Sequence, residues 1–233
     1  MGMIYMEEKK FSINERHYVF LLLVLVGGFF GAYTYNVRGG IFCNAQTANI
    51  VLLAMAIGVF NWWKVLYLII PISAYFLGSI LSEIMNKKMD NKHMFRWSTI
   101  FLVVEIIAVV ILGFLPTSIP HQISQVTLNF ICSMQFATFR KDEGVAMATT
   151  FVTNHIRETG RNFVDYVMEK DNKYKDKASR HGMMILMFII GGIASTILCT
   201  YLNVRAIWGS LPILIFLLIK FIDFDVKTRK LNA

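Results

Sequence analysis

Long uncharged stretches constrain this chain more than any other feature. Residues 20–35, 65–82, 106–139 and 183–204 contain no lysine, arginine, aspartate or glutamate. A helix needs about 20 mostly apolar residues to cross a bilayer, and in hydrocarbon every backbone amide must bond within the chain, which favours helices. Charged residues make up 16% of the chain, against about 25% in a soluble domain. The sequence therefore predicts an all-α integral membrane protein.

Six apolar blocks are long enough, or nearly so, to cross the membrane. They lie at about 18–35, 64–85, 96–115, 122–140, 182–203 and 205–222. Segments 41–60 and 144–168 are ambiguous, because each joins an apolar stretch to polar residues. If both cross, the chain has eight spans; if both dip into the membrane and return, it has six.

The placement of lysine and arginine favours six spans. Cytoplasmic loops are enriched in these residues. With six spans and a cytoplasmic N-terminus, only Arg38, Lys64 and Arg205 of the 23 basic residues lie outside. Eight spans would also expose the cluster at 87–96 and the pair at 140–141. We therefore expect six crossings, with both termini in the cytoplasm.

A polar signature occurs twice, about 106 residues apart. Residues 46–49 read Gln-Thr-Ala-Asn and residues 152–155 read Val-Thr-Asn-His, and each precedes a span with a small-residue pattern, around Gly78 and Gly191. Three crossings in each half would invert the second half relative to the first, an architecture found in transporters. We expect one membrane domain, 1–233, built as a 3+3 inverted repeat of about 18–115 and 122–222. Each half has an additional short re-entrant or broken helix, and a cytoplasmic loop covers about 157–180.

Several motifs together carry a family resemblance. They are Gly27-Gly28-Phe29 with Ala32-Tyr33-Thr34, Arg38-Gly39-Gly40, residues 46–51, Met134-Gln135, residues 138–140 and 148–150 running to Thr153, and Arg157. In these motifs the chain resembles the YoaK family of uncharacterised bacterial multi-span membrane proteins. The chain departs from that pattern at Ala48 and Asn154, where the family has glycine, at His155, where it has asparagine, and at Gly31, where aspartate is common. The resemblance implies a location in the bacterial cytoplasmic membrane, and it implies no substrate.

Polar residues within apolar segments are the candidates for a solute site. Thr47, Asn49, Thr153 and Asn154 are residue types that cap helix N-termini, whose partial positive charge suits an anion or a dipole. Glu105 lies in the middle of a span, where a carboxyl group usually faces the bundle interior. Arg38 and Arg157 flank the polar signatures, and we expect both at the membrane interface. The predicted binding residues are Gln46, Thr47, Asn49, Glu105, Gln135, Thr138, Thr153, Asn154 and Arg157.

No motif indicates catalysis. The chain contains no HExxH, GxSxG or phosphate-binding loop, and its three cysteines are too far apart in sequence for a usual zinc site. We therefore expect no enzyme activity, no cofactor and no metal. The basic residues, which give a net charge of +8, lie in loops, so we expect no nucleic-acid partner. The predicted function is a transporter or channel-like protein that moves a small solute or ion, with anions among the candidates, across the membrane. A non-transporting scaffold or partner-binding subunit is the alternative, and a homodimer is left open.

Overall fold

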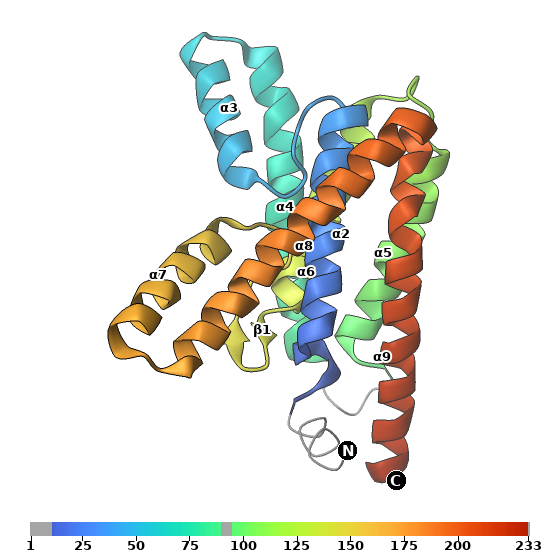
Figure 1. Ribbon diagram of the computed structural model, residues 1–233. Coiled ribbons are helices and arrows are strands. Elements are labelled where there is room, and N and C mark those ends of the chain that lie inside the picture. The colour runs from blue at the N-terminus through green and yellow to red at the C-terminus, as the bar shows by residue number, and fades with distance from the viewer. Residues whose placement is uncertain (1–10, 90–94, 233) are drawn as a thin grey trace.

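The computed structural model describes residues 11–89 and 95–232, and most of them are helical (Figure 1). The prediction of an all-α protein is confirmed. The helices are α2 (His17–Val37), α3 (Gln46–Gly58), α4 (Trp62–Lys88), α5 (Trp97–Phe114), α6 (His121–Thr138), α7 (Thr153–Glu169), α8 (Asn172–Leu202) and α9 (Leu211–Asn232). Shorter elements are the 3₁₀ helices η1 (Ile13–Glu15) and η2 (Asn203–Ser210) and a hairpin of β1 (Lys141–Asp142) and β2 (Val145–Ala146).

Several of these helices are long and apolar enough to cross a membrane. Within the described ranges they are His17–Val37, Trp62–Lys88, Trp97–Phe114 and Asn172–Lys230, the last running through α8, η2 and α9. Helix α2 is the most deeply buried of them. Many side chains of α4 and α8 are apolar and exposed, as expected of surfaces that contact lipid. The long apolar helices indicate a membrane-embedded protein.

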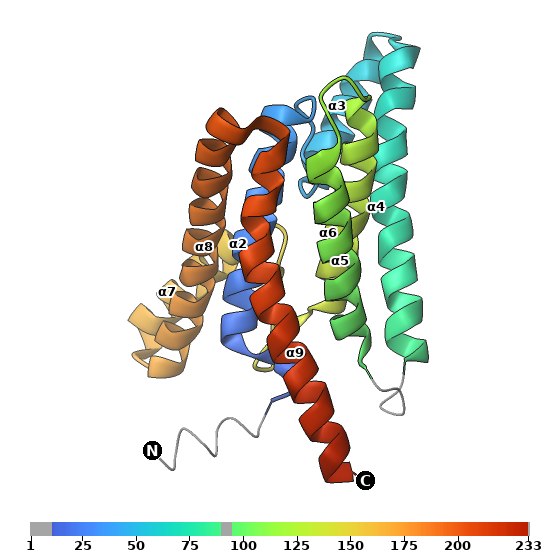
Figure 2. The same cartoon turned by 90° about the vertical axis from the view of Figure 1, so that its right-hand side faces the viewer.

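Two closely packed helix pairs form the centre of the bundle. Helix α2 packs along α8 and α4 packs along α6, while α5 lies beside α9 (Figure 2). Both pairs meet at glycines. Gly191 of α8 lies against the Leu25 carbonyl of α2, and a Cβ built on Gly78 of α4 would lie 2.5 Å from the Phe130 carbonyl of α6. Small residues let helix backbones approach this closely.

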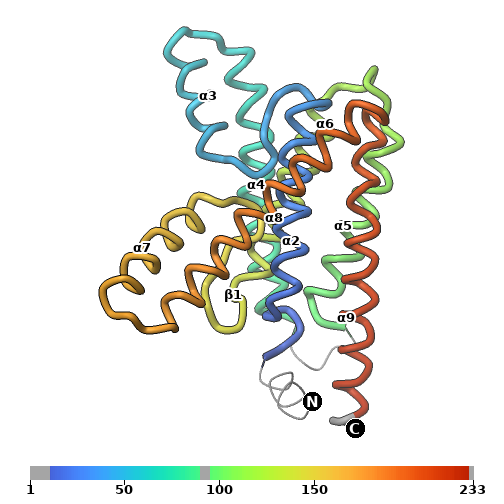
Figure 3. The backbone as a smooth tube through the Cα atoms, in the orientation of Figure 1, coloured from blue at the N-terminus to red at the C-terminus, as the bar shows by residue number. Residues whose placement is uncertain are grey.

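Two extended segments interrupt the helices. After α2 the chain turns at Gly39 and Gly40, which both have positive φ and so adopt a conformation that glycine allows at little cost. It then re-enters the bundle and forms α3. After the β1–β2 hairpin, residues 147–152 re-enter from the other end and lead into α7. Both short helices begin near the middle of the bundle and run outward toward opposite ends (Figure 3). We call residues 38–45 the first break and residues 139–152 the second break.

The expected loop at 157–180 is not a loop. These residues belong to α7 and α8, and only Lys170 and Asp171 separate the two helices. The segment is helical despite its charge, because Arg161 pairs with Glu158 and Asp165 along the α7 surface and Asp171 caps α8 by accepting a bond from the Lys173 amide. Its many charged residues form exposed helix faces.

Candidate functional site

Both breaks contact the same residue of α2. The Asn44 side-chain amide donates a hydrogen bond of 2.8 Å to the Gly27 carbonyl. From the other half, the Thr149 carbonyl oxygen lies where it would be 2.5 Å from a Cβ built on Gly27. Glycine is therefore needed here, because any side chain would push the second break away from α2. Gly27 brings together two segments that are about 105 residues apart in the sequence.

Each break is closed in the same way. In the first, the Asn49 side-chain amide donates to the Phe42 carbonyl at 2.7 Å. In the second, Nε2 of His155 bonds to the Ala148 carbonyl at 2.8 Å. In both cases a side chain of the short helix binds the carbonyl seven residues earlier in the extended segment. The two polar signatures therefore have a common structural role, which is to fold the break onto the start of its helix.

One face of α6 connects the two breaks. Asn129 accepts a 2.6 Å hydrogen bond from the Gln46 side-chain amide. One turn on, the sulfur of Cys132 lies 3.5 Å from that of Cys43 in the first break. A further turn on, Gln135 donates to the carbonyls of Leu23 and Thr149 at 3.0 and 3.5 Å. Residues three apart share a helix face, so this row contacts first α3, then the first break, and then both α2 and the second break.

The region around this row contains buried oxygen atoms that have no hydrogen-bond partner within the described residues. They are Oδ1 of Asn49, Oε1 of Gln135, the hydroxyl of Thr149, and both carboxyl oxygens of Glu105. The neighbouring Thr150 hydroxyl is within reach of the Tyr75 hydroxyl. Glu105 is fully buried in α5 and close enough to Cys132 to interact with it electrostatically. The expectation that Glu105 faces the bundle interior is therefore confirmed. Unpaired buried polar atoms are costly and rare, so this cluster is the candidate functional site. We call it the central site.

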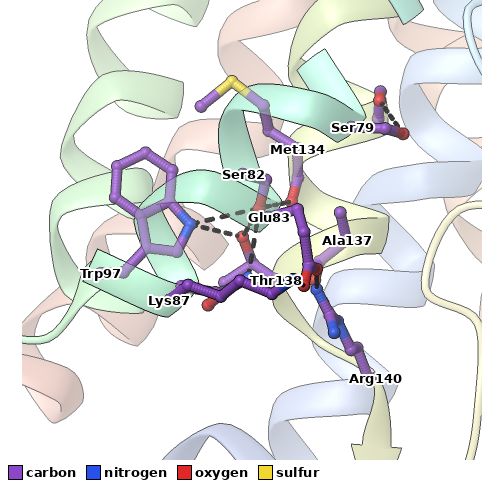
Figure 4. Close-up of polar contacts among 11 residues, drawn as sticks. Ser79, Ser82, Glu83, Lys87, Trp97, Met134, Ala137, Thr138 and Arg140 are labelled. Atoms are coloured by element: carbon purple, nitrogen blue, oxygen red, sulfur yellow. Dashed lines mark hydrogen bonds and ion pairs between the residues drawn. The ribbon is translucent and has the colours of Figure 1, made fainter. Parts of the chain in front are cut away.

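Thr138 lies outside the central site, in a separate polar contact between α4, α5 and α6. Its hydroxyl bonds to Ser82 at 2.8 Å and accepts a bond from the Trp97 indole at 3.0 Å (Figure 4). The Thr138 hydroxyl therefore has hydrogen-bond partners on both α4 and α5. Its role is to hold the three helices together.

The residues expected to cap the short helices do not cap them. The N-cap positions are Ala45 and Val152, and neither helix start has a side-chain cap. Thr47 and Thr153 are exposed. The physical reason is that α3 and α7 each begin one or two residues earlier than a cap at these threonines requires, so their side chains project from the first turn.

Asn154 and Arg157 are also outside the central site. Arg157 is exposed, donates to the Asn154 side chain at 2.8 Å and pairs with Glu158. Of the nine predicted binding residues, the structure gathers Gln46, Asn49, Glu105 and Gln135 around the row on α6, and it separates Thr47, Thr138, Thr153, Asn154 and Arg157 from that row.

Arg38 is buried at the ends of α2 and α5, and the expectation that it lies at the membrane interface stays a prediction. Its guanidinium donates to the carbonyls of Leu112 and Leu115 at the end of α5, at 2.9 and 2.7 Å, and to the Tyr33 hydroxyl at 3.0 Å. Gln125 donates to the Arg38 carbonyl. The negative end of the α5 dipole favours a cation at this position. Arg38 thus joins the first break to α5.

Several residues of the central site are not among the predicted binding residues, although Gly27 and residues 148–150 belong to the motifs that carry the family resemblance. The residues not predicted are Gly27, Cys43, Asn44, Asn129, Cys132, Thr149 and Thr150. Uncharged polar residues within an apolar segment were a usable signal for Asn44, Asn129, Thr149 and Thr150. No local signal pairs Cys43 with Cys132, because they meet only through the packing of the first break on α6.

The second break is surrounded by ionisable groups. Asp142 is buried and contacts His17 at 2.6 Å and Arg180 at 3.7 Å, and Arg180 also pairs with Glu143. Nδ1 of His155 lies 2.9 Å from Nδ1 of His181. Burial lowers the pKa of His155 below its usual 6.5, although its bond to the Ala148 carbonyl and the nearby Asp142 charge act in the opposite direction.

The chain matches a known protein family over most of its length. The model of the family described as "Protein of unknown function (DUF1275)" matches residues 19–220. The chain belongs to this family. The matched region of DUF1275 includes both breaks and all four residues that the central site retains from the prediction. Membership of an uncharacterised family agrees with the sequence analysis, while the resemblance to YoaK in particular stays a prediction. No curated protein and no solved structure matches the chain.

Proposed function

We propose that this DUF1275 protein moves a small solute or ion across the bacterial cytoplasmic membrane and binds it at the central site. The observation that carries the proposal is the meeting of the two breaks at Gly27 beside unpaired buried oxygens. Non-helical backbone at membrane depth is tolerated where it is buried in protein or lines a cavity. Broken helices that meet near the middle of a bundle form the substrate sites of many transporters.

The packing supports an inverted repeat of three crossings in each half. If α2 corresponds to α6 and α4 to α8, the pair α2–α8 corresponds to the pair α6–α4. Both pairs are the closely packed ones. Gly191 against Leu25 and Gly78 against Phe130 then occupy equivalent positions, as do the closing bonds of Asn49 and His155.

The six-span arrangement can be tested by labelling. We expect cysteines introduced at Lys88 and Lys175 to be shielded from an impermeant thiol reagent in intact cells, and a cysteine at Ser118 to react. The native Cys43, Cys132 and Cys199 are buried and should give little background. Labelling of Lys88→Cys from outside would contradict the arrangement and favour eight crossings.

The atoms of the central site favour a solute that donates hydrogen bonds or carries positive charge. Oδ1 of Asn49 and Oε1 of Gln135 can only accept hydrogen bonds, Glu105 adds a carboxyl group without a partner, and the Thr149 hydroxyl can accept as well as donate. The expected preference for an anion depends on the helix N-termini, and the threonines at those ends project away from the central site. We therefore propose a cation or a protonated amine as the first class to test.

Binding and flux measurements test the proposal. The purified protein would be screened by thermal shift against inorganic cations, amines and anions, and hits would be followed as flux into proteoliposomes. Glu105→Gln should fold and change flux, because the amide keeps the shape and removes the acid. Ser210→Ala removes a buried hydroxyl of η2 outside the site and is the control. Wild-type stability and flux in Glu105→Leu would overturn the assignment.

One observation favours the alternative of a partner-binding subunit. Helix α7 exposes Phe163, Val167 and Met168, the last by 78%, on a helix whose other face is charged. Such a surface suits a membrane interface, a second copy or another protein. If the protein gives no flux and purifies with a stable partner that Met168→Glu releases, the scaffold function is the better assignment.

A further inference from the structure

An apolar groove of about 830 Å³ opens beside the second break. Helices α4 and α6 form one wall, and β2 with the extended residues before α7 forms the other. Ile80, Ile84, Phe136, Met147 and Phe151 give the groove its apolar lining. A volume of this size is typical of sites that enclose a small molecule or part of a lipid.

One end of the groove is charged. Glu83 of α4 pairs with both Arg140 and Lys87, and Figure 4 shows the three side chains together where α4 and α6 end. Lys88 and Lys141 are the next residues in each segment and are exposed. Glu15 is a second carboxylate at this end, where it lines a small pocket with Arg140 and Lys141. The four basic residues outnumber the two carboxylates, which leaves this end positive.

Arg140 has donors to spare for a ligand. A guanidinium carries five N–H groups, and bonds to Glu83 and to the Ala137 carbonyl use two of them. Its side chain is 51% exposed, so the remaining donors are accessible. Arginine binds phosphate well because its planar fork matches two phosphate oxygens at once.

The groove is charged at one end and apolar at the other, as a bilayer is between its headgroups and its hydrocarbon. Helix α4 is one of the candidate spans, and basic residues at the end of a span lie at the level of the lipid headgroups. From that level the apolar lining runs toward Ser79 and Phe151, nearer the middle of the bundle. A ligand that fits has an anionic group at the membrane surface and a hydrocarbon chain pointing inward.

We propose that this groove binds an anionic phospholipid, with the phosphate at Arg140 and Lys87 and one acyl chain against Phe136 and Phe151. The proposal is independent of transport. A bound lipid would contact Met147 and Phe151, which lie on either side of Thr149 and Thr150, and it would therefore support the second break from the membrane side.

Native mass spectrometry can test this with defined lipids. The full chain in a mild detergent would be titrated with phosphatidylglycerol or phosphatidylcholine of identical acyl chains, and the retained lipid would be counted. We expect about fivefold tighter binding of phosphatidylglycerol, because a basic residue at an anionic surface contributes about 1 kcal/mol. Arg140→Gln should remove this preference. Ala146→Trp, which fills the groove, should reduce retention of both lipids.

Matched controls keep the result interpretable. Arg229→Gln removes an exposed arginine from the end of α9, and Ile107→Trp adds an indole to the exposed face of α5; neither should change lipid retention. If Arg140→Gln does not fold, Lys87→Gln replaces it, because that change keeps the pair of Arg140 with Glu83. Equal retention of the two lipids by the wild type, or an unchanged preference in both charge variants, would overturn the proposal. A dimer that retains no lipid would assign the groove to a second copy of the chain and would also overturn it.

Discussion

The two breaks have the same closure but different anchors. Asn49 closes the first and His155 the second, each on the carbonyl seven residues earlier. The first break is anchored by Arg38, which is buried and bonded to backbone carbonyls of α5. The second is anchored through Asp142, which contacts His17 and Arg180.

This difference indicates which break is easier to move. Arginine stays charged at any ordinary pH, and the carbonyls that it binds do not titrate, so the first anchor does not depend on pH. The second anchor consists of the ion pairs of Asp142 and Glu143 with His17 and Arg180. Part of it is exposed to solvent, where ion pairs contribute little stability. If the protein alternates between two states, we expect the second break to move and the first to act as the fixed reference.

The largest expected effect is on the first anchor. Arg38→Met would remove two hydrogen bonds from a charged donor, which contribute about 1.5–3 kcal/mol each. The Leu115 carbonyl would lose its donor, while the Leu112 carbonyl would keep its bond from the Leu115 amide. We expect a loss of about 3–6 kcal/mol, seen as a marked fall in the thermal unfolding temperature in detergent. Arg205→Met removes an exposed arginine and should have little effect. Equal unfolding temperatures for the two variants would show that Arg38 does not anchor the break.

A smaller effect is expected where the breaks meet α2. Gly27→Ala places a methyl group 2.5 Å from the backbone oxygen of Thr149, and backbone cannot move aside cheaply. Overpacking of this kind costs about 1–3 kcal/mol. Gly31→Ala meets only the Asn44 side chain, at 2.9 Å, which can rotate, so its cost should be lower. The thermal unfolding temperatures of the two variants show which of them loses more stability. Gly192→Ala is the control, because the nearest atom to a Cβ built there is 3.8 Å away. The reverse order would mean that the first break fits α2 more rigidly than the second.

The third prediction concerns pH and the single residue that distinguishes the two closures. Burial lowers the pKa of His155 in the folded protein, so below about pH 6.5 the unfolded chain binds a proton that the folded chain does not. Stability should therefore be full above that pH and fall as the pH decreases toward the folded pKa. His155→Asn restores the residue type of the first break and should reduce this acid-induced loss while leaving stability at pH 7.5 nearly unchanged.

The measurement is the unfolding temperature of wild type and variant between pH 7.5 and 5.5. His121→Asn, at the start of α6, controls for the loss of a histidine elsewhere. An acid-induced loss of the same size in His155→Asn and in the wild type would assign the pH dependence to another group, such as His181, whose pKa burial lowers to about 4.

The smallest effect is expected at the threonines of the two polar signatures. Thr47→Val and Thr153→Val change exposed side chains that cap nothing, and surface changes of this kind usually alter stability by less than about 0.5 kcal/mol. Thermal unfolding and the flux assay should both be close to wild type. A clear loss of flux in either variant would contradict this expectation and would show that the threonine contributes to solute binding.

The sequence by itself determined the elements that depend on local patterns. Uncharged blocks of about 20 residues can be stable in a bilayer only as helices, and α2, α4, α5 and α8 follow from them closely. The repeated polar signature located both short helices, because uncharged polar residues within an apolar segment need internal partners. A mid-span Glu105 could be assigned to the interior for the same reason, since a carboxyl group facing lipid is costly.

Only the tertiary structure decided which polar residues meet. Arg38 looks like an interfacial charge in the sequence, and it is buried because the end of α5 offers carbonyls at the point where the chain turns. Thr47 and Thr153 lie in the signatures and still point away, because helix phase and not residue type sets the direction of a side chain. Gly27, Cys132 and Thr149 form one site because α2, α6 and the second break pack together. Such contacts join residues over a hundred positions apart, and no local pattern records them.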